Sequence, residues 1–448
     1  LRRWHQRICG HQHGVCIMAI IQGTSKSSAA GFSIDQSIRF NDDDSAYLTK
    51  TFASDGNRRT WTFSTWVKFA NIKADNVLFS SWISSGASAY QLIYIDGADK
   101  LRLEDQSNNR LITNQVFRDV GAWYHVVARV DTTDATSSDR FQLYINGDRV
   151  TSFSTETQPS LNFEGNINKG SQPHYLGRNG YSLAMRYSYL YQAETHFIDG
   201  TALDPTSFGE TNADTGQWVP IAYTGSYGTN GFYITGADSA DLGADDSGNG
   251  NNFTSSGLAA ADQVSDSPTD NFWTLNPLDS NSTLANGNLQ NKGGGSTNTH
   301  APAFPTTGKW YVEIDCIDIN TGTAGAHFFG ICDASVNYNQ NFTDHAAISA
   351  GQQRGGQLQK NNSNTTTGTA VNDGDTIALA FDADNLTLDL YVNNVQSGSQ
   401  ITGLTDVQYK LWIQDGASVT NMQVNFGQTG GFTYTPPISF NALSTANL

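Results

Sequence analysis

The sequence predicts an all-β protein made of two antiparallel β-sandwiches joined by a Gly/Asn/Ser-rich segment of short strands and loops. Its 448 residues include 43 glycines and 11% aromatic residues but only 15% charged ones. Such a composition is rich in turn formers and ring side chains and poor in charged helix formers. Several stretches alternate apolar and polar residues, which is typical of strands. The same hairpin phrase also occurs twice, as FQLYINGDRV (residues 141–150) and LDLYVNNVQSG (residues 388–398).

The first sandwich is expected over residues 18–210. In WTFSTWVKF (residues 61–69), Trp61 and the apolar residues in step with it share one face. The other face is polar except at Trp66. This alternation predicts a strand that buries one face and exposes the other.

A hairpin is expected further along this sandwich. The alternating stretch WYHVVARVD (residues 123–131) precedes FQLYINGDRV, which returns through Asn146-Gly147. Both residues of this pair tolerate the positive φ of a tight hairpin turn. Further strands are expected at residues 76–84, 90–97 and 100–105.

The middle of the chain, residues 211–300, is expected to connect the two sandwiches through short strands and turns. GFYITG (residues 231–236) and NFWTLN (residues 271–276) are candidate strands. From about Ser280 to His300 the chain is rich in Asn, Gly, Ser and Thr. With few groups to bury, this stretch predicts a linker or a long loop.

The second sandwich is expected over residues 301–448. GKWYVEIDCID (residues 308–318) places Trp310, Val312 and Ile314 on one face. TIALAFDAD and LTLDLYVNNV predict the next antiparallel pair, and KLWIQDG and VTNMQVNFGQ complete the set. The repeated phrase is therefore expected to form an equivalent hairpin in each sandwich.

Residues 1–17 differ in amino-acid composition from the rest of the chain. We expect them to be a non-native or disordered leader, translated upstream of a true start at Met18. The leader contains four potential zinc ligands, because thiolate and imidazole are the usual donors to this metal. Their spacing matches no common zinc motif, and no metal site is predicted. The four are Cys9, His11, His13 and Cys16.

The net charge of −17 makes nucleic acid an unexpected partner, since phosphate neutralisation needs a basic face. No apolar run approaches the roughly 20 residues that a membrane helix requires, so membrane insertion is not expected. Four cysteines are too few for a disulfide framework in a chain of this length.

One set of carboxylates raises the question of catalysis. Glu313, Asp315 and Asp318 come close to the Glu-x-Asp-x-x-Glu motif of laminarinase-type glycosidases. Strand alternation puts Glu313 and Asp315 on one face, whereas Asp318 could join them only through a β-bulge. The same residues are explained as the solvent face of a strand, and we predict no enzyme and no catalytic residues. His125 and His196 are likewise expected to be satisfied sheet residues.

Calcium is the alternative cofactor, because it prefers oxygen ligands. Carboxylates and amides cluster in ADDSGNGNNFT (residues 244–254) and at residues 41–44. Such Asp/Asn/Gly clusters are more often simple turns. The prediction is therefore no cofactor and no metal, with calcium as the alternative.

The order RFNDDDSAYL, WTFSTWVKF, AWYHVVARVD, FQLYINGDRV, YLGRNG and AETHFIDGTALDPTSF resembles a laminin-G-like module of the concanavalin A-like lectin and glucanase superfamily. The resemblance covers most of residues 38–208 and implies a jelly-roll sandwich. GKWYVEID and GDTIALAFDADNLTLDLYVNNVQSG resemble a SPRY domain, over roughly residues 302–437.

HFIDGTALDPTSFGE, DSPTDNF and TLNPLD are similar to stretches in structural or tail-fibre proteins of marine tailed bacteriophages. This resemblance implies a virion protein, a tail fibre or appendage that recognises a host-surface polysaccharide or protein without catalysis. It also implies other virion proteins as partners and a homo-oligomer, with a trimer favoured. The alternatives are a purely structural decoration protein of the capsid or appendage, and a glycoside hydrolase using Glu313, Asp315 and Asp318. No ligand-binding residue is assigned.

Overall fold

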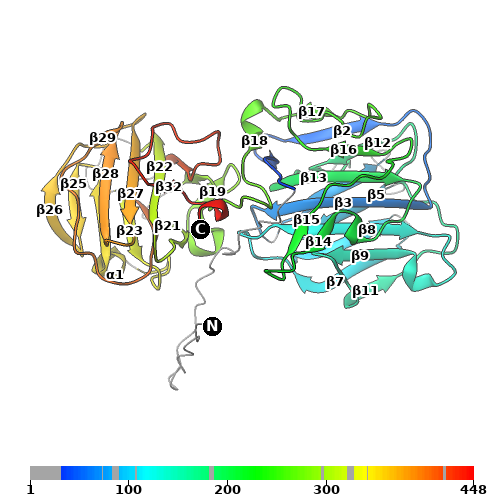
Figure 1. Cartoon of the computed structure of the whole chain (residues 1–448), viewed down its shortest axis with the longest axis horizontal. Coiled ribbons are helices and arrows are strands. Elements are labelled where there is room, and N and C mark those ends of the chain that lie inside the picture. The colour runs from blue at the N-terminus through cyan, green and yellow to red at the C-terminus, as the bar shows by residue number, and fades with distance from the viewer. Residues whose placement is uncertain are drawn as a thin grey trace, which may run out of the picture.

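The computed structural model describes residues 32–72, 74–82, 90–105, 108–180, 186–293, 297–319, 327–340, 342–416 and 420–448. Within these ranges strands dominate, and the single α-helix is the short α1 (Phe342–Ala347). Figure 1 shows two β-sandwiches side by side. The predicted all-β fold of two sandwiches is confirmed.

The first sandwich consists of two eight-stranded antiparallel sheets and a short hairpin. One sheet has the order β10 (Asp148–Arg149), β9 (Phe141–Ile145), β8 (Tyr124–Asp131), β3 (Thr60–Phe69), β13 (Leu190–Asp199), β1 (Ser37–Phe40) and β18 (Gln263–Val264), with β16 (Phe232–Ile234) paired to β13. The other has the order β11 (Phe153–Thr157), β7 (Arg110–Val116), β6 (Lys100–Asp105), β5 (Tyr90–Ile95), β4 (Asn76–Trp82), β12 (Pro173–Leu176), β2 (Tyr47–Thr51) and β17 (Thr254–Ser256). The hairpin is β14 (Gly209–Thr211) with β15 (Trp218–Pro220).

The second sandwich consists of an eight-stranded and a six-stranded sheet. The larger sheet has the order β19 (Thr283–Ala285), β20 (Gln290–Lys292), β31 (Asn421–Asn425), β22 (Lys309–Asp318), β27 (Thr376–Asp382), β28 (Thr387–Val392) and β29 (Val395–Gln396), with β32 (Asn441–Ala442) paired to β22. The smaller has the order β21 (Thr297–Ala303), β30 (Tyr409–Asp415), β23 (Phe328–Asp333), β24 (Ser349–Gln353), β25 (Gln357–Lys360) and β26 (Ser363–Thr367). Five 3-10 helices complete the described elements: η1 (Ser137–Asp139), η2 (Pro205–Ser207), η3 (Ala260–Asp262), η4 (Pro277–Asp279) and η5 (Thr445–Asn447).

The two predicted hairpins are confirmed. Asn146 and Gly147, with φ of 49° and 85°, turn β9 into β10. Asn393 and Asn394, with φ of 49° and 66°, turn β28 into β29. Positive φ at both turn residues matches the right-handed twist of the flanking strands, so the same phrase forms the same turn in both sandwiches.

Strand β3 differs from its prediction as a half-buried strand. Trp61 and the apolar residues in step with it lie in the first core, as expected. The opposite face is buried as well, because the chain that follows β13 covers it. The Thr62 hydroxyl donates to the carbonyl of Thr201 at 2.9 Å and accepts the backbone N–H of Leu203 at 2.7 Å. Alternation correctly identified the core face, but the outer face is not exposed.

The prediction of a linker or long loop between Ser280 and His300 is wrong. This stretch supplies β19, β20 and the start of β21 to the second sandwich, where β20 pairs with β31 and β21 pairs with β30. The preceding chain adds β16, β17 and β18 to the first sandwich. The strand expected at residues 271–276 is reduced to one bridge, between Phe272 and Ser444.

The two sandwiches meet through polar contacts. The Tyr191 hydroxyl of β13 donates to the carbonyl of Gly287 at 2.6 Å. Asn41 contacts Asn286 at 3.2 Å, and Lys292 pairs with Asp43 at 2.7 Å. These side-chain contacts hold the first sandwich against the loop and strand at residues 286–292 of the second.

Candidate functional site

A pocket of about 510 Å³ opens on the first sandwich, next to the hairpin β14–β15 and to the segment that leads into the second sandwich. Three tryptophans, Trp66, Trp123 and Trp218, line it together with polar side chains. Asn271 and Thr445, from the chain that enters and leaves the second sandwich, complete its wall. The pocket is thus assembled from segments that are far apart in the sequence.

Two of the tryptophans belong to a column of stacked rings. Trp66 of β3 is the cross-strand partner of His125 of β8, and their ring centroids lie 4.9 Å apart. The ring of Trp218, on β15, lies nearly parallel to that of His125, with the centroids 6.0 Å apart. Its indole fits there because two neighbouring positions are glycine: a Cβ on Gly147 or Gly209 would come within 2.5 Å of the ring.

His125 organises this column. Its Nδ1 accepts the indole N–H of Trp218 at 3.0 Å, and its Nε2 lies 2.8 Å from the Ser64 hydroxyl. Complete burial, assisted by the nearby His196, lowers the pKa of His125 to about 3. The ring is therefore neutral at neutral pH, as an acceptor at Nδ1 must be.

Trp123 and Trp218 offer the pocket ring surface, since their N–H groups are used inside the protein. The Trp123 indole donates to Asp266 at 3.0 Å, and that of Trp218 donates to His125. Polar groups beside the rings come from Asp119, Asp148 and Gln217. An apolar wall with a few polar groups is the usual composition of a small-molecule site. Aromatic surface of this kind can pack on the apolar face of a sugar while amides and carboxylates bond its hydroxyls.

Sequence reasoning assigned no ligand-binding residue and so did not find this pocket. One signal was present, the large aromatic Trp66 on an otherwise polar strand face. No comparable pattern marks Trp218, which enters through a hairpin about 150 positions away in the chain.

The three carboxylates that resembled a glycosidase motif are arranged differently. Glu313 is buried, and its carboxylate accepts the backbone N–H groups of Thr433 and Tyr434 at 2.8 and 2.9 Å. Asp315 accepts the Thr376 hydroxyl at 2.6 Å. Asp318 is exposed, after a shift in strand register that follows Cys316. The bulge exists, but the prediction of a solvent face is wrong for Glu313, which the C-terminal segment covers.

This geometry gives Glu313 a structural role that can be tested. Glu313→Ala is expected to lower the free energy of unfolding by about 2 kcal/mol, because two backbone N–H groups of the C-terminal segment lose the charged acceptor that holds them. Limited proteolysis should show faster cleavage around residues 432–440. Asp318→Ala, on the exposed end of the same strand, is the matched control. Equal stability of the two variants would contradict this role.

The structure also shows the surroundings of His196 and of the two segments proposed as alternative calcium sites. His196 is buried, stacks on Tyr233 at 4.3 Å and shares a 3.0 Å hydrogen bond with the Tyr227 hydroxyl, so it is satisfied as predicted. In the segment proposed for calcium, Asp245 accepts three backbone N–H groups, from Tyr233, Ser247 and Asn251.

In the segment at residues 41–44, Asp42 accepts the N–H of Asp43 at 2.9 Å, which is a turn contact. Within the described ranges, no group of three or more His, Cys, Asp or Glu side chains converges as metal ligands. The four potential zinc ligands of the leader lie outside the described residues. Nor does any described helix have the length and apolarity to cross a bilayer.

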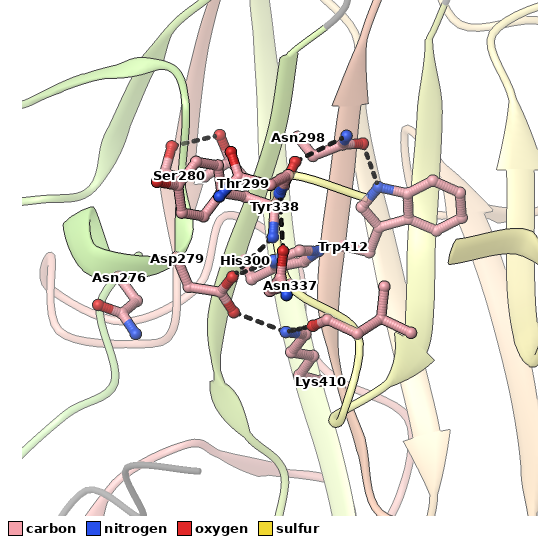
Figure 2. A network of polar contacts seen from close by, with 12 residues as sticks. Asn276, Asp279, Ser280, Asn298, Thr299, His300, Asn337, Tyr338, Lys410 and Trp412 are labelled. Atoms are coloured by element: carbon pink, nitrogen blue, oxygen red, sulfur yellow. Dashed lines mark hydrogen bonds and ion pairs between the residues drawn. The ribbon is translucent and has the colours of Figure 1, made fainter. Parts of the chain in front are cut away.

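A second polar cluster lies inside the second sandwich and was not anticipated (Figure 2). Asp279 of η4 pairs with Lys410 of β30 at 2.6 Å and with His300 of β21 at 3.1 Å. Burial alone would raise the pKa of Asp279, but His300 and Lys410 outweigh it and hold the carboxyl well below its usual range. Burial lowers the pKa of His300 to about 4, against the opposing effect of Asp279.

The same cluster extends along β21 and β30 and reaches α1. Asn298 accepts the Trp412 indole N–H at 3.0 Å, and Trp412 stacks on His345, which stacks on His300. Because these groups are enclosed between strands, we assign the cluster to stability.

Comparisons with known proteins agree with this architecture. Residues 40–185 match the family described as the concanavalin A-like lectin/glucanases superfamily. No curated protein matches the chain. The first sandwich therefore has a concanavalin A-like lectin fold.

Several solved structures also resemble parts of the chain. The SPRY domain of human HERC1 is 16% identical, with a TM-score of 0.31, covering 36% of this chain and 99% of that one. A putative carbohydrate binding protein from Bacteroides ovatus is 13% identical, with a TM-score of 0.34, covering 50% of this chain and 58% of that one. A SAP-like pentraxin from Limulus polyphemus is 18% identical, with a TM-score of 0.28, covering 39% and 80%. These likenesses concern the fold and carry no information about a ligand.

Proposed function

We propose that this protein is a component of a tailed-phage virion, a tail fibre or related appendage, that binds a host-surface polysaccharide without cleaving it. The observation that carries the binding role is the pocket walled by Trp66, Trp123 and Trp218 with carboxylate and amide groups beside them. The phage setting is supported by the resemblance of HFIDGTALDPTSFGE, DSPTDNF and TLNPLD to phage structural proteins.

The binding mode follows from the pocket chemistry. A pyranose ring has apolar C–H faces and a polar rim of hydroxyls. Indole surfaces contact the faces, and Asp148, Asp119 and Gln217 accept or donate hydrogen bonds at the rim. Loops held by a rigid sandwich keep these groups in place.

Each such contact is weak, so the proposal includes a homo-oligomer, with a trimer favoured, and assembly with other virion proteins. Several pockets on one appendage engage a repetitive polysaccharide at high effective concentration, which raises avidity without new contacts.

Trp218→Ala is the main test of this proposal. It is expected to weaken binding to the recognised glycan by about 30-fold, since truncating a central aromatic contact costs about 2 kcal/mol. The full-length protein is first screened on a bacterial glycan array, and the affinity of each variant is then measured by isothermal titration calorimetry. Trp218→Phe, which retains a ring, should lose less.

Gln396→Ala, on the exposed strand β29 of the other sandwich, is the control and should bind as the wild type does. Absence of binding to any surface glycan at high avidity would favour a purely structural decoration role. Release of reducing ends from β-glucans that disappears in Glu313→Gln would instead assign a hydrolase.

A further inference from the structure

A lysine, an asparagine and an aspartate meet at the junction of the two sandwiches, directly beneath the pocket. Lys68, near the end of β3, and Asp266 are both 0% exposed. The Lys68 Nζ lies 2.7 Å from Asp266 Oδ2 and 2.8 Å from Asn271 Oδ1. The carbonyl of Phe272, also at 2.8 Å, is the third acceptor around the amine.

Asn271 is held in a fixed orientation. Its side-chain Nδ2 donates to the carbonyl of Gly121 at 2.8 Å, so the amide oxygen is turned toward Lys68. Its backbone N–H donates to the Thr445 hydroxyl at 2.9 Å. The carboxamide carbon lies one C=O bond, about 1.2 Å, from the oxygen that Lys68 already contacts. Amine and electrophilic carbon are therefore close to reacting distance.

We propose that Lys68 and Asn271 form an intramolecular isopeptide bond, with Asp266 as the catalytic acid–base. The Lys68 Nζ attacks the Asn271 carboxamide carbon and forms a C–N bond. The bond from that carbon to Nδ2 breaks, and Nδ2 leaves as ammonia. The products are one secondary amide and one ammonia. No oxidant, reductant or further reactant is needed.

The surroundings favour the protonation states that this step requires. Burial lowers the pKa of the Lys68 amine, and the opposing charge of Asp266 only partly offsets it. Burial likewise raises the pKa of Asp266 against the effect of Lys68. A buried pair of this kind gains by sharing its proton as a neutral amine and a neutral acid. The neutral amine is the form that can act as a nucleophile.

Asp266 is placed to move the protons. Its Oδ2 contacts the amine, while its Oδ1 accepts the Trp123 indole N–H at 3.0 Å and the backbone N–H of Phe272 at 3.3 Å. The carboxyl group is thus held by one oxygen and free to exchange a proton through the other. The protonated carboxyl group gives its proton to the departing nitrogen, and the resulting carboxylate takes the proton released by the attacking amine.

The bond would join the first sandwich to the beginning of the second. Lys68 belongs to β3, whereas Trp273, two positions after Asn271, already lies in the second core. The two residues are 203 positions apart in the chain. A covalent closure of this length restricts the unfolded chain more than a short one does.

Intact mass spectrometry of the purified full-length protein tests the proposal. The wild type is expected to be lighter than its sequence by one ammonia. Tryptic digestion should yield a branched peptide that joins the Lys68 and Asn271 segments, identified by tandem fragmentation. Lys68→Arg and Asp266→Asn should both have the full sequence mass, and after boiling in detergent they should migrate differently from the cross-linked wild type.

The wild-type measurement decides the matter even where a variant folds poorly. Folded wild type at its full sequence mass, with unlinked Lys68 and Asn271 peptides after prolonged incubation, would overturn the proposal. Loss of ammonia without the branched peptide would overturn it too, because an asparagine can lose ammonia elsewhere. This result is independent of whether the pocket binds a glycan.

Discussion

Asp279→Ala is expected to lower the free energy of unfolding by about 3–5 kcal/mol, because it leaves the buried charge of Lys410 without its counter-ion. Lys410 lies in β30, enclosed by β21 and the chain around residue 336, whose carbonyl is its remaining partner. Asp279 also accepts the backbone N–H of Tyr338 at 3.0 Å and so ties this chain to η4 (Figure 2). Removing one carboxylate therefore affects three elements at once.

Denaturant unfolding followed by tryptophan fluorescence measures this effect. Asp406→Ala is the control, since Asp406 is exposed on the same sandwich, and surface substitutions of this kind change stability by about 0.5 kcal/mol or less. Asp279→Asn separates charge from shape: it should remain strongly destabilised because the amide cannot neutralise Lys410. An Asp279→Ala protein as stable as the Asp406→Ala control would show that the pair contributes nothing.

Acidification from pH 7 to pH 4.5 is expected to destabilise the protein by an amount on the order of 5 kcal/mol, comparable to the whole stability of an ordinary domain. Burial lowers the pKa of both His125 and His174 to about 3, from an ordinary value of about 6.5. Each ring uses one nitrogen as an acceptor: His125 from Trp218, and His174 from the backbone N–H of Asn168 at 2.9 Å.

The sign follows from which state binds the proton. Between about pH 6.5 and pH 3 the unfolded chain protonates these histidines and the folded chain does not. Stability is therefore complete above pH 6.5 and falls on acidification, by about 1 kcal/mol per pH unit for each histidine.

Equilibrium unfolding at a series of pH values measures this slope. His125→Gln removes one of three histidines whose pKa burial lowers, the third being His300, and should flatten the slope by about a third. An unchanged slope in His125→Gln would show that the acid sensitivity arises elsewhere. His345→Gln does not serve as a control for this measurement, because His345 stacks within the cluster around His300.

Much of the fold could be predicted because apolar alternation and turn chemistry are local signals. Asn146-Gly147 fixes one hairpin, and the apolar rows of β3 and β22 line the two cores. The predictions were wrong where polar side chains are buried by partners that are distant in the sequence. The strand β21 reads as a polar linker because the partners of its polar side chains lie on other elements. Asn298 bonds Trp412 of β30, 114 positions away, and His300 contacts Asp279 of η4, on the far side of β19 and β20.

The candidate pocket could not be predicted for the same reason. Its rings come from β3, from the chain before β8 and from β15. Alternation within one strand shows that Trp66 interrupts a polar face, but it cannot show that Trp218 will bond to the neighbouring His125. Glu313 illustrates the converse error, since a carboxylate on the outer face of a strand was buried by a segment that follows about 120 positions later.

The hydrogen bonds made by residues 269–271 have a mechanical consequence. Ile34 exchanges two backbone hydrogen bonds with the Thr269 hydroxyl, each 2.9 Å long, and Thr445 contacts Asn271, so the residues before β1 and the helix η5 are fastened to the same short stretch. The two sandwiches extend to either side of it, with the C-terminus between them (Figure 1). Tension applied at Ile34 and Thr445 would therefore pass through residues 269–271 and leave the strands of both lobes unloaded, so that each lobe keeps its shape under a pull.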